Sequence, residues 1–172
     1  MAKTKTKRRY YRRTRWSANI NEIDTTLPIG PTATAYGSVT LQTNPVQSTT
    51  TVAQQYTVKN IEMTYELEVS ESNATILEKC QVYLMYAPQG MVISADYPYQ
   101  HPEYIMAYKW LGSPNVDGQP NRNPLTIKTR MARRLQTGDG IIFLIIGTNP
   151  PTTNTGITLT VRGLVRYWTK AN

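Results

Sequence analysis

The sequence has 172 residues but only one cysteine and one histidine. A single cysteine excludes an internal disulfide, so the fold cannot depend on an oxidising compartment. These two residues also cannot build a Cys-rich or His-rich zinc site. Long apolar runs are missing as well, because the longest covers residues 141–146, far short of the ~20 residues that span a bilayer. We therefore expect no such metal site and no membrane insertion.

Motifs for catalysis and nucleotide binding are absent too. The sequence contains no H-E-x-x-H, C-x-x-C, G-x-S-x-G or P-loop pattern. A nucleophile pair of Cys80 and His101 is conceivable, but Cys80 follows the apolar register of a strand and fits better as a small core residue. Asp139 between two glycines is typical of a tight turn rather than of a general base. We expect no enzyme and no cofactor.

What the sequence does have is positive charge, and all of the excess lies at one end. Lys and Arg number 19 against 11 Asp and Glu, for a net charge of +8. Residues 3–15 contain no acidic side chain, and basic and acidic side chains cancel in the residues after Trp16. A neutral domain that carries a basic tail indicates a tethered polycation that binds a polyanion.

The basic segment also contains aromatic residues. The side chains that we expect to bind nucleic acid are Lys3, Lys5, Lys7, Arg8, Arg9, Tyr10, Tyr11, Arg12, Arg13, Arg15 and Trp16. Arginine binds phosphate in a bidentate manner, and aromatic rings stack on unpaired bases. Residues 1–16 are therefore predicted to form a flexible arm that binds single-stranded nucleic acid. Short basic clusters are also typical of nuclear import signals, so an import receptor is a further expected partner.

The remaining residues, 17–172, have the pattern of one all-β domain. Residues 61–69 place apolar side chains at odd positions and Glu62, Glu66 and Glu68 opposite them. This alternation predicts a half-buried antiparallel strand, whose glutamates suit a solvated or subunit-facing side better than a metal site. The run 141–146 predicts a central strand covered on both faces. Further strands are predicted at 33–41, 80–86, 104–110, 125–131 and 157–168, mostly separated by turns. This many strands without a convincing helix favours a sandwich.

Three stretches carry a resemblance to a known family. They are HPEYIMAYKWLGSP at 101–114, MARRLQTGDGIIFLI at 131–145 and GITLTVRGLVRYWTK at 156–170. Together with the basic arm, they resemble the capsid proteins of small circular single-stranded DNA viruses, the circovirus-like group. The resemblance implies a single jelly roll of eight antiparallel strands, B to I, in sheets BIDG and CHEF. It implies strands at 32–43 (B), 56–69 (C), 78–87 (D), 103–111 (E), 125–131 (F), 132–137 (G), 140–147 (H) and 156–169 (I).

The same resemblance implies a function in the virion. The chain would self-assemble into a small icosahedral shell, T=1 with about 60 copies, and package single-stranded DNA, with assembly in the host nucleus. Loops 44–55, 88–102 and 148–155 would cluster near five-fold axes. Independently of the resemblance, the Pro and Gly content of loop 112–124 indicates an exposed loop, and we expect it to contact a host attachment receptor. The side chains expected at subunit interfaces are Tyr97, Tyr99, His101 and Tyr104, because tyrosine buries a large area and keeps a polar tip.

Two other functions fit parts of the sequence. A cellular nucleic-acid-binding protein, such as a ribosomal protein with a basic tail, would explain the arm. Such proteins usually carry basic patches on the folded domain as well, whereas residues 17–172 are neutral overall. A receptor-binding jelly roll of the cytokine or lectin kind would explain the strands and leave the arm unexplained.

Overall fold

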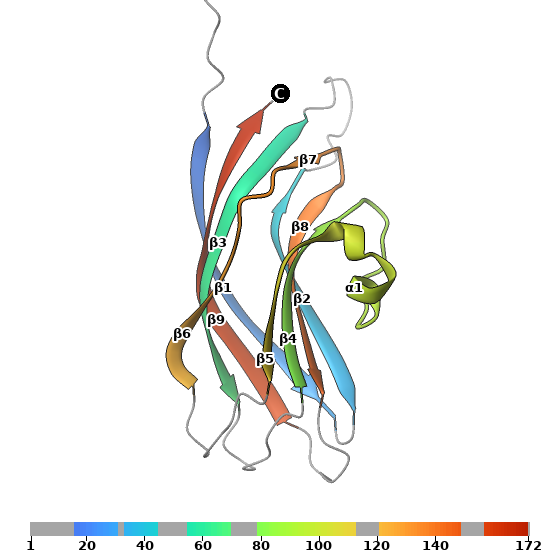
Figure 1. Cartoon of the computed structure of the whole chain (residues 1–172), viewed down its shortest axis with the longest axis vertical. Coiled ribbons are helices and arrows are strands. Elements are labelled where there is room, and N and C mark those ends of the chain that lie inside the picture. The colour runs from blue at the N-terminus through green and yellow to red at the C-terminus, as the bar shows by residue number, and fades with distance from the viewer. Residues whose placement is uncertain are drawn as a thin grey trace, which may run out of the picture.

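The computed structural model of the chain describes residues 16–30, 33–44, 55–69, 79–112, 121–148 and 157–171. These residues form nine strands and two short helical segments (Figure 1). The strands are β1 (Ser17–Ile29), β2 (Thr34–Thr43), β3 (Tyr56–Val69), β4 (Lys79–Ala87), β5 (Ile105–Gly112), β6 (Asn121–Thr129), β7 (Arg133–Leu135), β8 (Gly140–Thr148) and β9 (Ile157–Ala171). The helical segments are α1 (Tyr97–Gln100) and the 3₁₀ turn η1 (Pro102–Tyr104). The predicted all-β fold class is confirmed.

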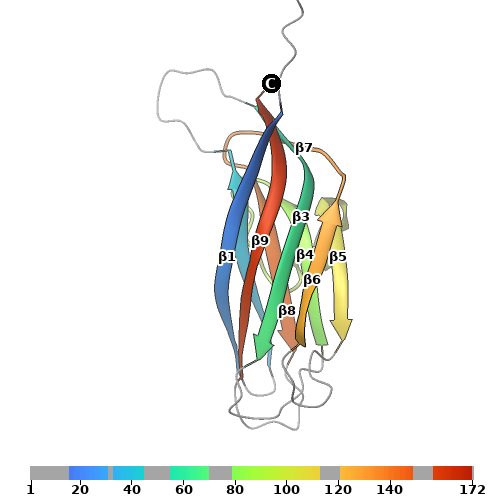
Figure 2. The same ribbon diagram turned by 90° about the vertical axis from the view of Figure 1, so that its left-hand side faces the viewer.

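The strands build two antiparallel sheets that face each other. One has the order β1-β9-β3-β6, with β7 paired to β3, and the other has the order β2-β8-β4-β5. Figure 2 shows the first sheet in front of the second. With β1 to β6 taken as strands B to G, and β8 and β9 as H and I, these orders are BIDG and CHEF. The predicted jelly-roll sandwich is therefore confirmed.

The letters predicted for strands B to G were wrong by one strand, although the segments assigned to B to F do contain strands. The segment Ser17–Ile29 was not predicted to be a strand, yet it pairs along its whole length with β9. Residues 32–43 are therefore strand C rather than B, and each later assignment moves on by one up to strand G. The segment expected to be strand G contains β7, a short extra strand on β3, while β6 takes the place of G.

Strand β1 was not predicted because polar residues occupy part of the side that faces the other sheet. Ile23 and Ile29 are buried, but Asn21 has the same parity and weakens the hydrophobic alternation. The Asn21 side-chain amide donates to the Leu41 carbonyl at 3.1 Å and to the Tyr167 hydroxyl at 3.0 Å. Hydrogen bonds thus satisfy a polar residue where the pattern would need an apolar one.

The expected grouping of three loops at one end of the molecule was also wrong. Thr43 and Ala87, the residues at which β2 and β4 end, both pair with Gly140 at the start of β8. Thr148 lies at the other end of β8. The loops that follow β2 and β4 therefore leave one end of the sandwich, and the loop that follows β8 leaves the opposite end.

The main core fills the space between the sheets, and β8 contributes to cores on both of its faces. Ile141, Phe143 and Ile145 belong to the cluster between the sheets. Ile142, Leu144 and Ile146 belong to a second cluster on the outer side of the sheet, beneath Tyr97 and its neighbours. Figure 1 shows α1 on that outer side. The prediction of a strand covered on both faces is confirmed.

Strand β5 departs from its predicted alternation. Met106 is buried, but Tyr108 and Trp110 are 71% and 56% exposed. Ala107 and Leu111 pack against the main core instead. The pairing of β5 with β4 shifts register at two points, and each shift exchanges the sides on which the following residues lie.

Candidate nucleic-acid interface

The predicted arm lies outside the described residues except for Trp16, with which the description begins. The residues not placed are Lys3, Lys5, Lys7, Arg8, Arg9, Tyr10, Tyr11, Arg12, Arg13 and Arg15. Trp16 contacts the five-stranded sheet that contains β3, because Lys59 Nζ lies 3.9 Å from the centroid of its ring. The face of an indole ring attracts a cation, so this contact holds the last residue of the predicted arm against β3.

Trp16 joins a cluster at the end of the sheet where β1 begins and β9 ends. The two strand ends lie side by side in Figure 2. Trp168 of β9 pairs with Ala18 on one side and with Lys59 on the other. Its neighbour Tyr167 points into the core, so Trp168 lies on the outer face, where it is 36% exposed. We call Trp16, Lys59 and Trp168 the arm-root cluster.

Ion pairs cross the outer face of this sheet. Arg166 Nη2 lies 2.9 Å from Glu62 Oε2, and Arg162 lies 3.3 Å from Glu68 and 3.7 Å from Asp24. All of these side chains are well exposed, so each pair contributes only about 0–1 kcal/mol to stability. Glu62 and Glu68 thus lie on the side of β3 away from the core, as the alternation predicted.

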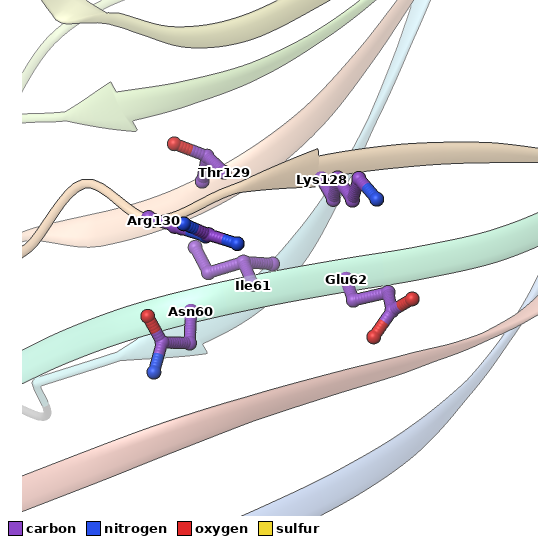
Figure 3. Close-up of a pocket in the computed structure, with 6 residues that line it drawn as sticks. All are labelled: Asn60, Ile61, Glu62, Lys128, Thr129 and Arg130. Carbon is purple, nitrogen blue, oxygen red and sulfur yellow. The ribbon is translucent and has the colours of Figure 1, made fainter.

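A groove of about 530 Å³ lies between β3 and β6 on the same face, lined by Asn60, Ile61, Glu62, Lys128, Thr129 and Arg130 (Figure 3). Asn60 has a φ of 50°, and the pairing of β3 with β9 shifts between Lys59 and Glu62. A bulge of this kind bends the strand and opens the sheet locally. Lys128 and Arg130 are exposed, and their N–H groups can donate to an anion.

The four residues predicted at subunit interfaces lie in one segment on the outer side of the second sheet. Tyr97 is only 1% exposed, and its hydroxyl donates to the Tyr86 carbonyl at 3.1 Å. The His101 ring stacks on Tyr104 with centroids 5.2 Å apart. Tyr99 is 65% exposed and donates to Gln81 Oε1 at 3.0 Å. Of the four, Tyr99 offers the largest surface to a neighbouring molecule.

Tyr99 belongs to a wider exposed aromatic surface. Its partner Gln81 pairs with Trp110 of β5, and Tyr108 stacks with Tyr83 at 6.3 Å between centroids. Tyr108 and Trp110 are both more than half exposed. We call Tyr99, Tyr108 and Trp110 the aromatic surface of the second sheet. Contact of this surface with another subunit stays a prediction.

The residues considered for nucleophilic chemistry occupy structural positions. Cys80 is fully buried, and burial raises the pKa of its thiol to about 12, so the reactive thiolate does not form near neutral pH. Asp139 accepts hydrogen bonds from the backbone N–H of Gln136 at 2.8 Å and of Gln89 at 3.1 Å. The predictions of a core cysteine and a turn aspartate are confirmed.

Within the described ranges, no group of three or more His, Cys, Asp or Glu side chains could hold a metal ion. The helices among those residues are also too short and too polar to cross a membrane.

The sequence did not single out the residues of the arm-root cluster on the folded domain or the cations of the groove. Lys59, Trp168, Lys128 and Arg130 come from three separate segments, each with ordinary composition. The alternation along each strand offered a signal, because Lys128 and Trp168 alternate with the apolar side chains of their own strands and so lie on the other face. This alternation indicates that both side chains face outward, but only the strand order places them on the same face of one sheet.

Comparisons with known proteins give similarity in fold only. A scan against protein-family models and a search of curated proteins find no match. Among solved structures, a mud crab tombus-like virus structure covers 99% of this chain and 96% of its own, with 11% identity and a TM-score of 0.44. A turnip yellow mosaic virus structure covers 87% and 92%, with 16% identity and a TM-score of 0.39. A decameric BFDV capsid protein covers 92% and 100%, with 9% identity and a TM-score of 0.37. Identities and TM-scores this low assign no function to the chain.

Proposed function

We propose that this chain is a viral capsid protein that assembles into a closed shell and binds single-stranded nucleic acid through residues 3–16. The observation that carries the proposal is the division of charge between arm and domain. The net charge of +8 precedes Ser17, and the jelly roll that follows is balanced. A balanced sandwich suits side-by-side packing of copies, whereas a cationic arm suits a polyanion.

The arm has the chemistry for a single strand. Its arginines bind phosphates, and Tyr10, Tyr11 and Trp16 offer planar faces to unpaired bases at ~1–3 kcal/mol each. Neutralising a phosphate of a single strand changes log K by about −0.7 per unit of log salt concentration. Full engagement of the arm therefore gives a slope of roughly −5 to −6.

Closed symmetry multiplies this charge. In a T=1 shell of about 60 copies, the arms together supply several hundred positive charges. If each arm points inward, this charge offsets the repulsion among the phosphates of the packaged genome. No catalysis is needed, because assembly and neutralisation are both binding steps.

The contacts between copies are proposed to use the aromatic surface of the second sheet, with Tyr99 as its anchor. Exposed Tyr and Trp side chains are enriched at interfaces because they bury area while retaining a polar tip. The rings of Tyr97, His101 and Tyr104 pack against one another in the segment that contains Tyr99. The resemblance to circovirus-like capsid proteins favours DNA as the cargo. The basic cluster of the arm suits an import receptor and hence assembly in the host nucleus. The Pro/Gly-rich loop 112–124 is proposed to contact a host receptor.

The experiment is to express the full chain and a variant in which Arg8, Arg9, Arg12, Arg13 and Arg15 are serine. Particle size is measured by light scattering and electron microscopy, and nucleic-acid content by the ultraviolet absorbance ratio. We expect shells of uniform diameter that contain nucleic acid from the full chain. We expect the variant to lose the nucleic acid and to keep the β-sheet circular dichroism spectrum.

Monomers under every salt and pH condition tried would contradict the capsid function. Shells whose nucleic-acid content does not change in the arginine variant would contradict the role of the arm. A second variant, Tyr99→Ala, tests the interface, with Tyr36→Ala as control because Tyr36 is also exposed and lies on β2. We expect Tyr99→Ala alone to reduce assembly.

A further inference from the structure

The outer face of the five-stranded sheet, formed by β1, β9, β3, β6 and β7, is divided in charge along its strands. At the end where β1 begins, the cationic side chains are Lys59, Lys128, Arg130, Arg134, Arg166 and Lys170. We call these six the cationic end. Glu62 is the one acidic side chain among them in the part of the sheet that the structure describes. Toward the opposite end, Arg162 is accompanied by Glu22, Asp24, Glu66 and Glu68. A domain that is neutral in total thus has a positive end.

Most charges of the cationic end form no ion pair with the side chains that the structure describes. Arg166 pairs with Glu62, but no ion pair among the described residues involves Lys128, Arg130, Arg134 or Lys170. Like charges gathered on one surface repel each other and produce a positive potential. A bound polyanion removes that repulsion.

The cationic end also carries a surface for stacking. Trp168 is 36% exposed between Ala18 and Lys59, and Trp16 lies against Lys59. Single-strand binding sites combine such aromatic faces with cations that follow the backbone. Both elements are present here on rigid strands.

We infer that the cationic end, together with Trp168 and the groove at Asn60, is a second contact surface for single-stranded nucleic acid. Phosphates bind Lys128 and Arg130 at the groove, and a base stacks on Trp168. The inference rests on the proposed function and extends it from the arm to the folded domain. A strand held by residues 3–15 leaves the arm at Trp16, which is part of the same surface, so the two contacts are continuous.

The acidic part of the same face on a second copy is the competing occupant, because it also complements positive charge. Nucleic acid is favoured by the exposed indole of Trp168, which an acidic partner does not require, and by the eight basic residues that precede Trp16 in the chain. Substitutions on this surface distinguish the two occupants. If nucleic acid binds there, the substitutions weaken oligonucleotide binding, whereas if a second copy binds there, they alter assembly.

The test measures binding of the full chain to fluorescently labelled oligothymidylate by anisotropy, over a series of salt concentrations. The double variant Lys128→Ala/Arg130→Ala is expected to lower the magnitude of the log-log salt slope by about 1.4, because each lost phosphate contact removes about 0.7. Trp168→Ala is expected to weaken binding roughly 5- to 100-fold at constant slope. Trp168→Phe retains a ring and is expected to restore most of the affinity.

Matched controls remove the same groups elsewhere. Lys79→Ala/Arg162→Ala removes two cations far from the arm, and Tyr36→Ala removes an exposed aromatic ring from the other sheet. Neither control is expected to change the slope or the affinity beyond experimental scatter. Circular dichroism spectra identical to that of the unmodified chain establish that each variant is folded.

Several outcomes overturn the inference. One is unchanged binding in both Lys128→Ala/Arg130→Ala and Trp168→Ala. Another is an equal loss of binding in the matched controls. A third is altered particle assembly with unchanged oligothymidylate binding, which would assign the surface to a second copy. The arm variant separates this inference from the proposed function. Loss of binding in the arm variant alone leaves the arm's role intact and refutes the second surface. Loss of binding in the cationic-end variants alone supports the second surface and contradicts the role of the arm.

Discussion

Tyr65 and Tyr97 are both tyrosines with almost no solvent exposure, but their hydroxyl groups have opposite surroundings. The Tyr65 ring packs against Phe143 with centroids 5.4 Å apart, and its hydroxyl has no hydrogen-bond partner in the described part of the chain. The Tyr97 hydroxyl donates to the Tyr86 carbonyl. A buried polar group without a partner loses its hydration without compensation, so the two hydroxyls should affect stability with opposite signs.

We therefore expect Tyr65→Phe to raise the free energy of unfolding by about 1 kcal/mol, because it removes an unsatisfied hydroxyl and keeps the ring. Tyr97→Phe is expected to lower it by about 1 kcal/mol, because it leaves the Tyr86 carbonyl without its donor. Urea unfolding followed by tryptophan fluorescence measures both. A loss of stability in Tyr65→Phe would show that the hydroxyl has a partner.

At the scale of elements, prediction succeeded where alternation was strong and failed where polar residues replaced apolar ones. Strand β3 was predicted because Ile61, Met63 and Leu67 are all buried at odd positions. Strand β1 was missed, although it is an edge strand of thirteen residues. Hydrogen bonds from Asn21 support it from inside, and such bonds between distant segments leave no periodic signal.

The register of β1 predicts unequal effects of two isoleucines. Ile23 is 2% exposed and Ile20 is 66% exposed. Ile23→Ala is expected to cost about 2–4 kcal/mol of stability, because it opens a cavity between the sheets. Ile20→Ala is expected to change stability by less than about 1 kcal/mol. Chemical denaturation measures both values, and equal costs would contradict the register of β1 on β9.

At the scale of the whole molecule, several ionisable side chains are held neutral in the interior. Burial raises the pKa of the Cys80 thiol and that of the Tyr97 hydroxyl to about 12 each. Burial also raises the pKa values of Tyr65 and Tyr83 well above the ordinary range. The folded state therefore retains protons that the unfolded chain releases near pH 8.5 for cysteine and near 10 for tyrosine.

Stability should accordingly fall in alkali. A folded-state pKa above the unfolded value gives stability that is complete below the unfolded pKa and decreases as pH rises toward the folded one. We expect a constant free energy of unfolding from pH 7 to about 8, then a decline approaching about 1.4 kcal/mol per pH unit from Cys80, steepening above pH 10. Denaturant titrations at stepped pH measure this decline.

The control is Cys80→Ala, which has no thiol to ionise. Its stability at neutral pH is expected to be lower because a buried group is lost, but its curve should stay flat up to about pH 10. A decline of the same slope between pH 8.5 and 10 in both proteins would contradict the assignment to Cys80.

The sequence by itself determined the fold class, the covered central strand and the position of the net charge. These follow from local pattern, since alternation along one segment and the count of charges do not depend on what lies across the sheet. It did not predict β1, and therefore not the place of each strand in the sheets, because β1 is stabilised by hydrogen bonds to distant segments.

Only the tertiary structure decided how the domain's own charges are arranged. Lys59 and Lys128 are far apart in sequence. The segment 56–69 has more acidic than basic residues, whereas the segment 121–129 has no acidic residue. Pairing of β9 and β6 with β3 brings cations to one end of the sheet and carboxylates toward the other. Net charge is a sum over the chain, whereas electrostatic potential depends on which strands are neighbours.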